Sequence, residues 1–106
     1  MARTLITLPS TAKRGEVIEI RTLINHPMET GYRRDADGQA LPRDLIRRFA
    51  CRYDGELVFT AELHAAIAAN PYLAFHTVAT RSGVLSFTWE GDNGFTQTES
   101  RSIVVT

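Results

Sequence analysis

The chain has 106 residues, of which 43% are hydrophobic and 23% are charged, and its formal net charge at pH 7 is zero. This composition is typical of a globular domain, and it excludes an intrinsically disordered chain and a strongly basic nucleic-acid-binding protein. No apolar run approaches the ~20 residues that a membrane-spanning helix needs. We therefore expect a single domain over residues 1–106, with neither nucleic acid nor a membrane as partner.

The charge is unevenly distributed. Residues 1–52 contain ten of the twelve basic residues and six acidic residues, so the second half has an excess of acid. Within twenty positions the chain carries six arginines: Arg33, Arg34, Arg43, Arg47, Arg48 and Arg52. Such a cluster is either a solvated face or a docking patch for an acidic partner or an anion.

The first predicted strands show period-2 alternation. A short strand is expected over Thr4–Leu8 and ends at Pro9. In the next strand, within residues 16–24, the apolar face is predicted to carry Ile18, Ile20, Thr22 and Ile24. One buried face and one solvated face are typical of an antiparallel sheet.

A hairpin is predicted around Asp54-Gly55, because this dipeptide tolerates the positive φ angles of a tight turn. On the strand before it, Phe49, Cys51 and Tyr53 share one face. On the strand after it, the alternation places four residues inward: Leu57, Phe59, Ala61 and Leu63.

The remaining segments complete an all-β pattern. Residues 61–70 are interpreted as a crossover with one helical turn, and Pro71–Ala79 as a strand whose inward side the pattern leaves open. Leu85, Phe87 and Trp89 share the inner face of the next strand, a tight turn follows at residues 91–94, and a final strand closes the chain. About seven short strands predict an immunoglobulin-like antiparallel β-sandwich.

The stretch from Asn25 to Arg43 is too long and too polar for an ordinary hairpin turn. His26 and Met28 are residue types that bind soft metals, which leaves open a small metal-binding or redox sandwich that uses His26, Met28 or Cys51. The alternative is a loop whose path is set by Pro27 and Gly31.

Catalytic chemistry has little support in the sequence. Cys51 is the only cysteine, so no intrachain disulfide forms, and its position between Phe49 and Tyr53 predicts a buried, unreactive thiol. Glu90 and Asp92 are expected to be solvated at a strand end. We find no nucleophile–base pair, phosphate-binding loop or metal motif, and therefore expect neither an enzyme nor a bound cofactor.

Three segments together resemble the SoxZ family: "RGEVIEIRTLINHPMETGYRRDADGQALPRDLI", "ANPYLAFHTVA" and "GVLSFTWEGDNG". The family is the small subunit of the SoxYZ carrier of thiosulfate oxidation. The resemblance implies an immunoglobulin-like sandwich that acts as a non-catalytic scaffold for SoxY, whose C-terminal arm carries the sulfur intermediates on a cysteine. Separate Sox enzymes then act on these intermediates in turn.

The resemblance also implies partners and a location. The expected partners are a SoxY-like subunit in a heterodimer and transiently docking Sox enzymes, with a homodimer as an option for the isolated chain. The family works in the periplasm, and residues 1–16 lack the apolar core of a secretory signal, so we expect export together with SoxY. The hypothesised partner-binding residues are His26, Pro27, Met28, Glu29, Tyr32, Arg33, Arg34, Asp35 and Arg43.

Overall fold

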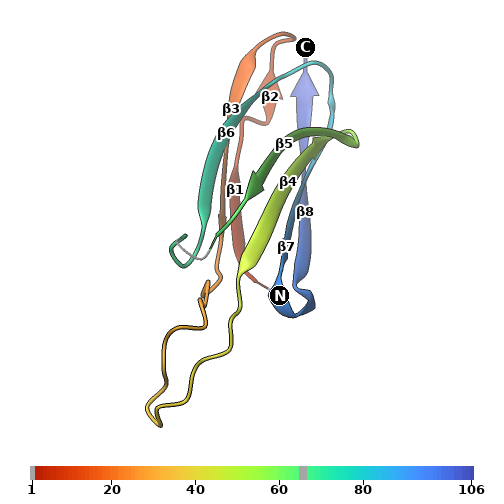
Figure 1. The fold of residues 1–106 in the computed structure, drawn as a ribbon. Coiled ribbons are helices and arrows are strands. Elements are labelled where there is room, and N and C mark those ends of the chain that lie inside the picture. The colour runs from red at the N-terminus through yellow and green to blue at the C-terminus, as the bar shows by residue number, and fades with distance from the viewer. Residues whose placement is uncertain (1, 65–66) are drawn as a thin grey trace.

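The computed structural model describes residues 2–64 and 67–106 of the chain (Figure 1). The strands of this part are β1 (Thr4–Thr7), β2 (Thr11–Ala12), β3 (Val17–Ile24), β4 (Ile46–Tyr53), β5 (Glu56–Glu62), β6 (Tyr72–Val78), β7 (Gly83–Gly91) and β8 (Thr96–Val105). A single 3-10 turn, η1 (Asp92–Gly94), connects the last two strands. Among the described residues there is no helix long and apolar enough to cross a membrane.

The strands form two layers. One sheet has the order β1-β3-β6 and the other the order β2-β8-β7-β4-β5. All neighbours are antiparallel except the two-residue strand β2, which runs parallel to β8. The predicted all-β, immunoglobulin-like sandwich is therefore confirmed.

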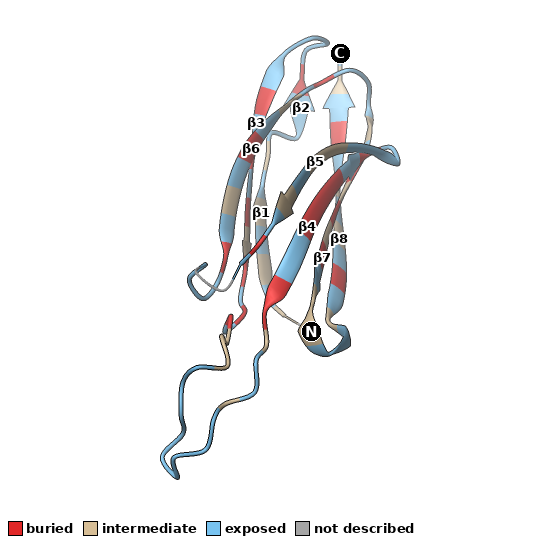
Figure 2. Ribbon diagram, in the orientation of Figure 1, coloured by how far each residue is buried: buried red, intermediate tan, exposed pale blue. Residues whose placement is uncertain are grey.

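The alternation read from the sequence identifies most of the core. Along β3 the four residues predicted to face inward are buried, and so are Leu85, Phe87 and Trp89 on β7. Figure 2 shows the resulting bands, with buried residues separated by exposed ones along the strands. Asp54 and Gly55 have φ angles of 49° and 85°, as expected for the predicted tight turn.

An aromatic cluster joins the two sheets and settles which side of β6 faces inward. The rings of Phe59 on β5 and Phe75 on β6 stack with their centroids 4.2 Å apart. Phe49 on β4 contacts both of them and also Trp89, whose ring centroid lies 5.2 Å away. Since offset and edge-on aromatic pairs add to the free energy of burial, this cluster stabilises the contact between the layers.

The predicted inner face of β5 is wrong at its first position. A bulge shifts the register between β4 and β5, so that Cys51 pairs with Phe59 but Arg52 pairs with Leu57. Val58 is the extra residue of β5 at this bulge, because it has no partner of its own on β4. It packs against the core, whereas Leu57 points outward and is 43% exposed.

The described part of residues 61–70 contains no helical element, although the Ile67 N–H donates to the His64 carbonyl over 2.9 Å, which is the spacing of a single turn. β5 continues to Glu62, and the chain then reaches Asn70, which has a φ of 55°, through bends. Residues 65 and 66 of this prediction lie outside the described residues.

Candidate functional site

The segment between β3 and β4 leaves the sandwich at the end opposite the C-terminus (Figure 1). Residues 29–44 form two paired limbs, which we call the projecting hairpin. At its base the backbones of Glu29 and Asp44 exchange two hydrogen bonds, of 2.7 and 2.8 Å. Further out, the Leu41 N–H donates to the Arg33 carbonyl over 2.9 Å. The molecule measures 58 × 20 × 20 Å, an elongated shape to which the hairpin contributes.

The tip of the projecting hairpin is closed by Asp35. Its Oδ1 accepts hydrogen bonds from the backbone N–H groups of Asp37 and Gln39, each over 2.9 Å. Arg34 donates from Nη1 to the Gly38 carbonyl over 2.9 Å. Side-chain bonds of this kind define a turn locally, so the tip has a specified shape although it is exposed.

Nearer the base, Glu29 holds Arg33. The guanidinium donates to both carboxylate oxygens, with Nη2–Oε1 at 2.7 Å and Nε–Oε2 at 3.0 Å. This hydrogen bond lowers the pKa of Glu29 and raises that of Arg33. Tyr32, which precedes Arg33 in the chain, is 86% exposed. The outer surface of the hairpin thus presents an aromatic ring and oriented arginines.

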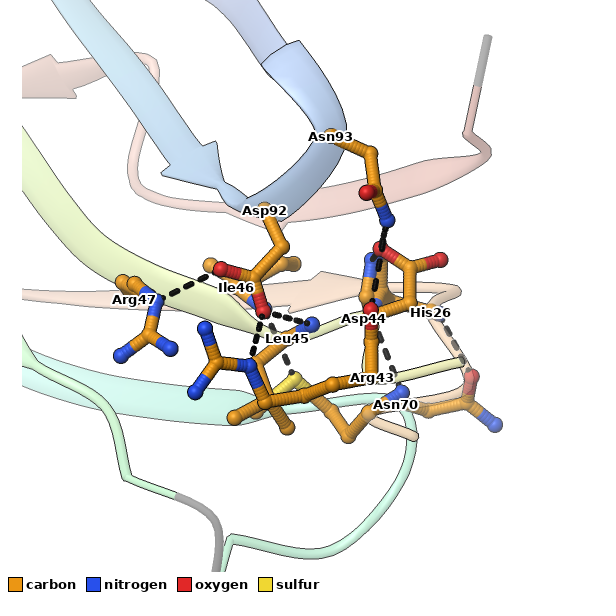
Figure 3. Close-up of polar contacts among 10 residues, drawn as sticks. His26, Arg43, Asp44, Leu45, Ile46, Arg47, Asn70, Asp92 and Asn93 are labelled. Carbon is orange, nitrogen blue, oxygen red and sulfur yellow. Dashed lines mark hydrogen bonds and ion pairs between the residues drawn. The ribbon is translucent and has the colours of Figure 1, made fainter. Parts of the chain in front are cut away.

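Asp92 in the η1 turn ties the returning limb to the sandwich (Figure 3). Its Oδ2 accepts the Leu45 N–H at 3.1 Å and lies 3.2 Å from Arg43 Nε, and its Oδ1 accepts from Arg47 Nε at 2.7 Å. The hydrogen bond from Arg47 is the main reason that the pKa of Asp92 is lowered. The expectation of a solvated Asp92 is therefore wrong, because three donors occupy its carboxylate and its side chain is only 13% exposed.

Two backbone features bring these groups together. A bulge in β4 against β7 lies between Ile46 and Arg48, and it leaves Arg47 free to turn toward Asp92. At the facing position of β7, a Cβ on Gly91 would lie 2.3 Å from the Leu45 carbonyl oxygen. Only glycine permits this approach of the two backbones.

The outgoing limb is anchored by the His26-Pro27-Met28 segment. The Met28 N–H donates to His26 Nδ1 over 3.0 Å, and the Met28 sulfur accepts the Ile46 N–H over 3.3 Å. His26 also exchanges hydrogen bonds with Asn70, from its backbone N–H to Asn70 Oδ1 at 2.9 Å and from Asn70 N–H to its carbonyl at 2.8 Å. Met28 has a φ of 50°, which is unusual for a residue with a side chain and is held by these contacts.

These contacts narrow the hypothesised partner-binding set. His26 and Met28 are buried beneath the projecting hairpin and do not contribute to its outer surface. Pro27 lies between them, while Glu29, Tyr32, Arg33, Arg34, Asp35 and Arg43 belong to the hairpin itself. That these residues bind a partner stays a prediction. The sequence reading missed Asp44, Asn70, Asp92 and Asn93, which come from three separate segments and show no common pattern.

The metal or redox alternative is not favoured by the geometry. The Nδ1 lone pair of His26 accepts the Met28 N–H and is not available to a metal, and the buried sulfur of Met28 accepts the Ile46 N–H. Within residues 2–64 and 67–106 no group of three or more His, Cys, Asp or Glu residues is placed to hold an ion. Cys51 is fully buried, and burial raises the pKa of its thiol to about 12.

A second exposed feature lies on the outside of the three-stranded sheet. Leu5, Leu23 and Tyr72 form one row across β1, β3 and β6. Leu5 and Tyr72 are 62% and 57% exposed, and all three residues line a shallow hollow of about 200 Å³. Val17 and Val78 pair at the other end of the same face, and both are exposed. Between these two ends the same face carries Glu19, which pairs with Arg21 and His76. We call the five apolar residues the apolar face.

Solved structures with the same fold include two functional groups of proteins. A superoxide reductase (neelaredoxin) from Ignicoccus hospitalis is 17% identical, with a TM-score of 0.73 over 97% of this chain and 79% of that chain. The sulfur carrier protein SoxY from Chlorobium limicola f thiosulfatophilum is 11% identical, with a TM-score of 0.66 over 97% of this chain and 78% of that chain. At such identities the similarity shows the fold alone.

Sequence comparison is more specific. A search of curated proteins found no match. The family model described as "Sulphur oxidation protein SoxZ" matches residues 6–102, which include most of both sheets and the whole projecting hairpin. This match covers most of the chain, so the protein belongs to the SoxZ family.

Proposed function

We propose that the chain is the non-catalytic partner subunit of a SoxY-type sulfur carrier. The observation that carries the proposal is the position of Cys51, the only cysteine, at the centre of the core. A thiol with a pKa of about 12 is protonated at neutral pH and cannot act as the nucleophile that accepts sulfur. In the SoxYZ carrier the sulfur is accepted by the cysteine of the other subunit, SoxY. This leaves binding as the role of this chain.

The apolar face is the proposed contact with SoxY. Stable subunit interfaces are more apolar than ordinary surface, and this face combines a row of Leu5, Leu23 and Tyr72 with the exposed pair Val17 and Val78. The SoxY from Chlorobium limicola f thiosulfatophilum is itself a sandwich of this fold, which supports a sheet-against-sheet heterodimer.

The projecting hairpin is the proposed docking site for the Sox enzymes that visit the carrier. Tyrosine and arginine are enriched among residues that dominate binding energy, and Tyr32 and Arg34 are exposed near its tip. Because the turn at Asp35 and the base at Glu29 and Asp44 are hydrogen-bonded, less conformational entropy is lost when a partner binds.

We further propose that the protein works in the periplasm and is exported while bound to SoxY. A sandwich with one buried cysteine needs no disulfide, so it is suited to folding before export. Fractionation of cells with and without the SoxY-type gene tests this proposal. Periplasmic protein in cells that lack the partner would contradict it.

The partner role is tested by mixing the purified chain with a SoxY-type subunit and measuring sedimentation. We expect a 1:1 complex and no thiosulfate turnover by the chain alone. Two separately sedimenting species at concentrations of about 10 μM would refute a stable heterodimer, since obligate subunits associate more tightly than this.

A further inference from the structure

His26 occupies a position that normally suits asparagine or aspartate. In an Asx-turn the side-chain oxygen of residue i accepts the N–H of residue i+2, and here His26 Nδ1 accepts the Met28 N–H over 3.0 Å. An imidazole nitrogen accepts a hydrogen bond only while it carries no proton. The His26 side chain is 5% exposed, so water does not readily replace this bond. The turn therefore depends on the protonation state of one buried ring.

Each neighbouring segment contributes a group that faces the ring or its backbone. Asp44, on the returning limb, places Oδ1 3.6 Å from His26 Nε2. From the β7–β8 connection, Phe95 makes an edge contact with a centroid distance of 5.2 Å, and Asn93 Nδ2 lies 3.4 Å from the same Asp44 oxygen. Asn70 binds the His26 backbone. Further charges on the returning limb and the η1 turn belong to the Asp92 cluster, which includes Arg43 and Arg47.

The hydrogen bond from the Met28 N–H requires the neutral form of the His26 ring. Since Nδ1 accepts, the single proton lies on Nε2 and faces the Asp44 carboxylate. A second proton would have to enter at Nδ1, where it would point at the Met28 N–H across 3.0 Å. Two donors would then oppose each other, and a buried N–H would lose its acceptor.

Asp44 attracts the protonated ring, but this attraction does not preserve the turn. The Asp44 side chain is 38% exposed and shares its carboxylate with Asn93, and ion pairs at such positions are weak. The lost hydrogen bond, in contrast, is buried. The protonated ring and the present position of Met28 therefore exclude each other.

Met28 transmits the change to both limbs of the projecting hairpin. Its backbone leads directly into Glu29, which pairs with Asp44, and its sulfur accepts the Ile46 N–H at the start of β4. We propose that His26 is a positioning residue that acts as a proton-sensitive latch: the neutral ring holds the root of the projecting hairpin, and protonation releases it. The biological effect of the latch rests on the proposed function: if the projecting hairpin is the docking site, docking of Sox enzymes weakens as the pH falls.

The latch is tested first in the free chain, by NMR over about pH 5 to 8, the range in which histidines change charge. We expect the His26 ring to be the Nε2–H form at the upper limit. As the ring protonates, the protection factor of the Met28 amide should fall about tenfold, as expected for one lost buried hydrogen bond. The Glu29 and Asp44 amides should lose protection at the same pH. Unchanged Met28 protection through the titration of His26 would overturn the proposal.

Two variants distinguish the latch from a purely structural role. In His26→Asn the side-chain oxygen can accept the Met28 N–H and does not titrate, so protection should be retained at every pH. His76→Asn is the control: His76 lies on the outside of β6, with Nε2 3.8 Å from Glu19, and its replacement should leave the transition intact. The same transition in His26→Asn would refute the latch. Should this variant fail to fold, the titration of the natural chain still decides.

Docking is measured separately, with the complex of this chain and SoxY. Binding of a Sox enzyme should weaken about tenfold from the upper to the lower pH with the natural chain, and should change less than twofold with His26→Asn. If the free chain shows the transition but docking is independent of pH, the latch stands and the proposed role of the hairpin fails. If neither changes with pH, the latch itself fails.

Discussion

At the scale of single residues, Asp92 shows how one carboxylate positions a distant segment. It accepts from the Leu45 N–H and from Arg47, and it pairs with Arg43, all within the few residues that lead from the projecting hairpin into β4. The carboxylate itself comes from a turn more than forty positions later in the chain. Local alternation contains no information about such a contact, which explains why the sequence reading assigned Asp92 to solvent.

The low pKa of Asp92 predicts how stability depends on pH. Its folded-state pKa lies below the ordinary 3.8, so between the two values the unfolded chain binds more protons than the folded one. The contribution is present above about pH 4 and is lost as the pH falls through the folded-state value. We expect Asp92→Asn to lower Tm by roughly 5 °C at pH 7 and to flatten the acid decline of Tm.

The matched control for this change is Asp37→Asn, at the exposed tip of the hairpin. It should leave both Tm at pH 7 and the shape of the acid decline within error of the natural chain. Thermal unfolding followed by circular dichroism from pH 2 to 7 measures both variants. An Asp92→Asn protein with an unchanged acid decline would show that Asp92 does not contribute to acid sensitivity.

The burial of other residues could be predicted where it follows from local alternation, and could not where it depends on distant segments. The burial of Cys51 follows from its place between Phe49 and Tyr53, and the structure confirms it. That the stretch from Asn25 to Arg43 binds a partner stays a prediction, and two of its hypothesised binding residues, His26 and Met28, lie buried beneath the projecting hairpin. They contact Asn70, Ile46 and Phe95, which come from three other segments of the chain, so the local sequence does not reveal their burial.

At the scale of secondary structure, strands with strict alternation could be predicted along their whole length, whereas strands with bulges could be predicted only on one side of the bulge. β3 and β7 follow period 2 from end to end of their buried faces. In β4 and β5, one extra residue at each bulge reverses the direction of the side chains that follow, which exposes Leu57 and turns Arg47 toward Asp92. A bulge depends on the pairing of two strands, so a single strand pattern does not reveal it.

Among the glycines of the strands and turns, Gly91 is the one whose substitution should destabilise the fold most. A Cβ there would meet the Leu45 carbonyl oxygen at 2.3 Å and the Ile46 Cα at 2.9 Å, and both are backbone atoms that cannot rotate away. We expect Gly91→Ala to lower the free energy of unfolding by about 3 kcal/mol, and to reduce amide protection at Leu45 and Asp92. Chemical denaturation and hydrogen exchange measure these two effects.

Gly94→Ala provides the control within the same β7–β8 connection. Its added Cβ would have no neighbour within 4 Å, and only the positive φ of 73° opposes it, at a cost of about 1 kcal/mol. Protection at Leu45 and Asp92 should be retained in this variant. Equal losses in the two variants would mean that the close approach at Gly91 is not the reason for glycine there.

At the scale of the whole molecule, the sandwich separates two exposed features. The projecting hairpin extends from one end (Figure 1), whereas the apolar face lies at the two ends of the outside of the β1-β3-β6 sheet, with Glu19, Arg21 and His76 between them. This arrangement would allow SoxY to bind the sheet while a visiting enzyme contacts the hairpin. The two proposed contacts can therefore be changed independently by substitution.

The hairpin contact is expected to affect association more than folding. The Arg34 side chain donates to the Gly38 carbonyl within the exposed tip, so Arg34→Glu should change Tm by less than about 2 °C. Its effect should appear in the rate at which a Sox enzyme associates with the loaded carrier, and in the salt dependence of that rate. Arg101→Glu, on β8, is the control that changes net charge equally. If Arg34→Glu and Arg101→Glu changed the association rate equally, the effect would come from the net charge of the protein and not from docking at the hairpin.

The central claim is that the apolar face binds SoxY, and the most direct measurement is the affinity of the SoxY complex for two variants. Tyr72→Glu introduces a charge in the row of Leu5, Leu23 and Tyr72, while Val104→Glu introduces the same charge at a similarly exposed valine on β8 of the other sheet. Sedimentation equilibrium should show a Kd about thirtyfold higher for Tyr72→Glu, as for the loss of an interface hot spot, and a change below twofold for Val104→Glu. Unchanged affinity with Tyr72→Glu, or an equal loss with Val104→Glu, would contradict the account.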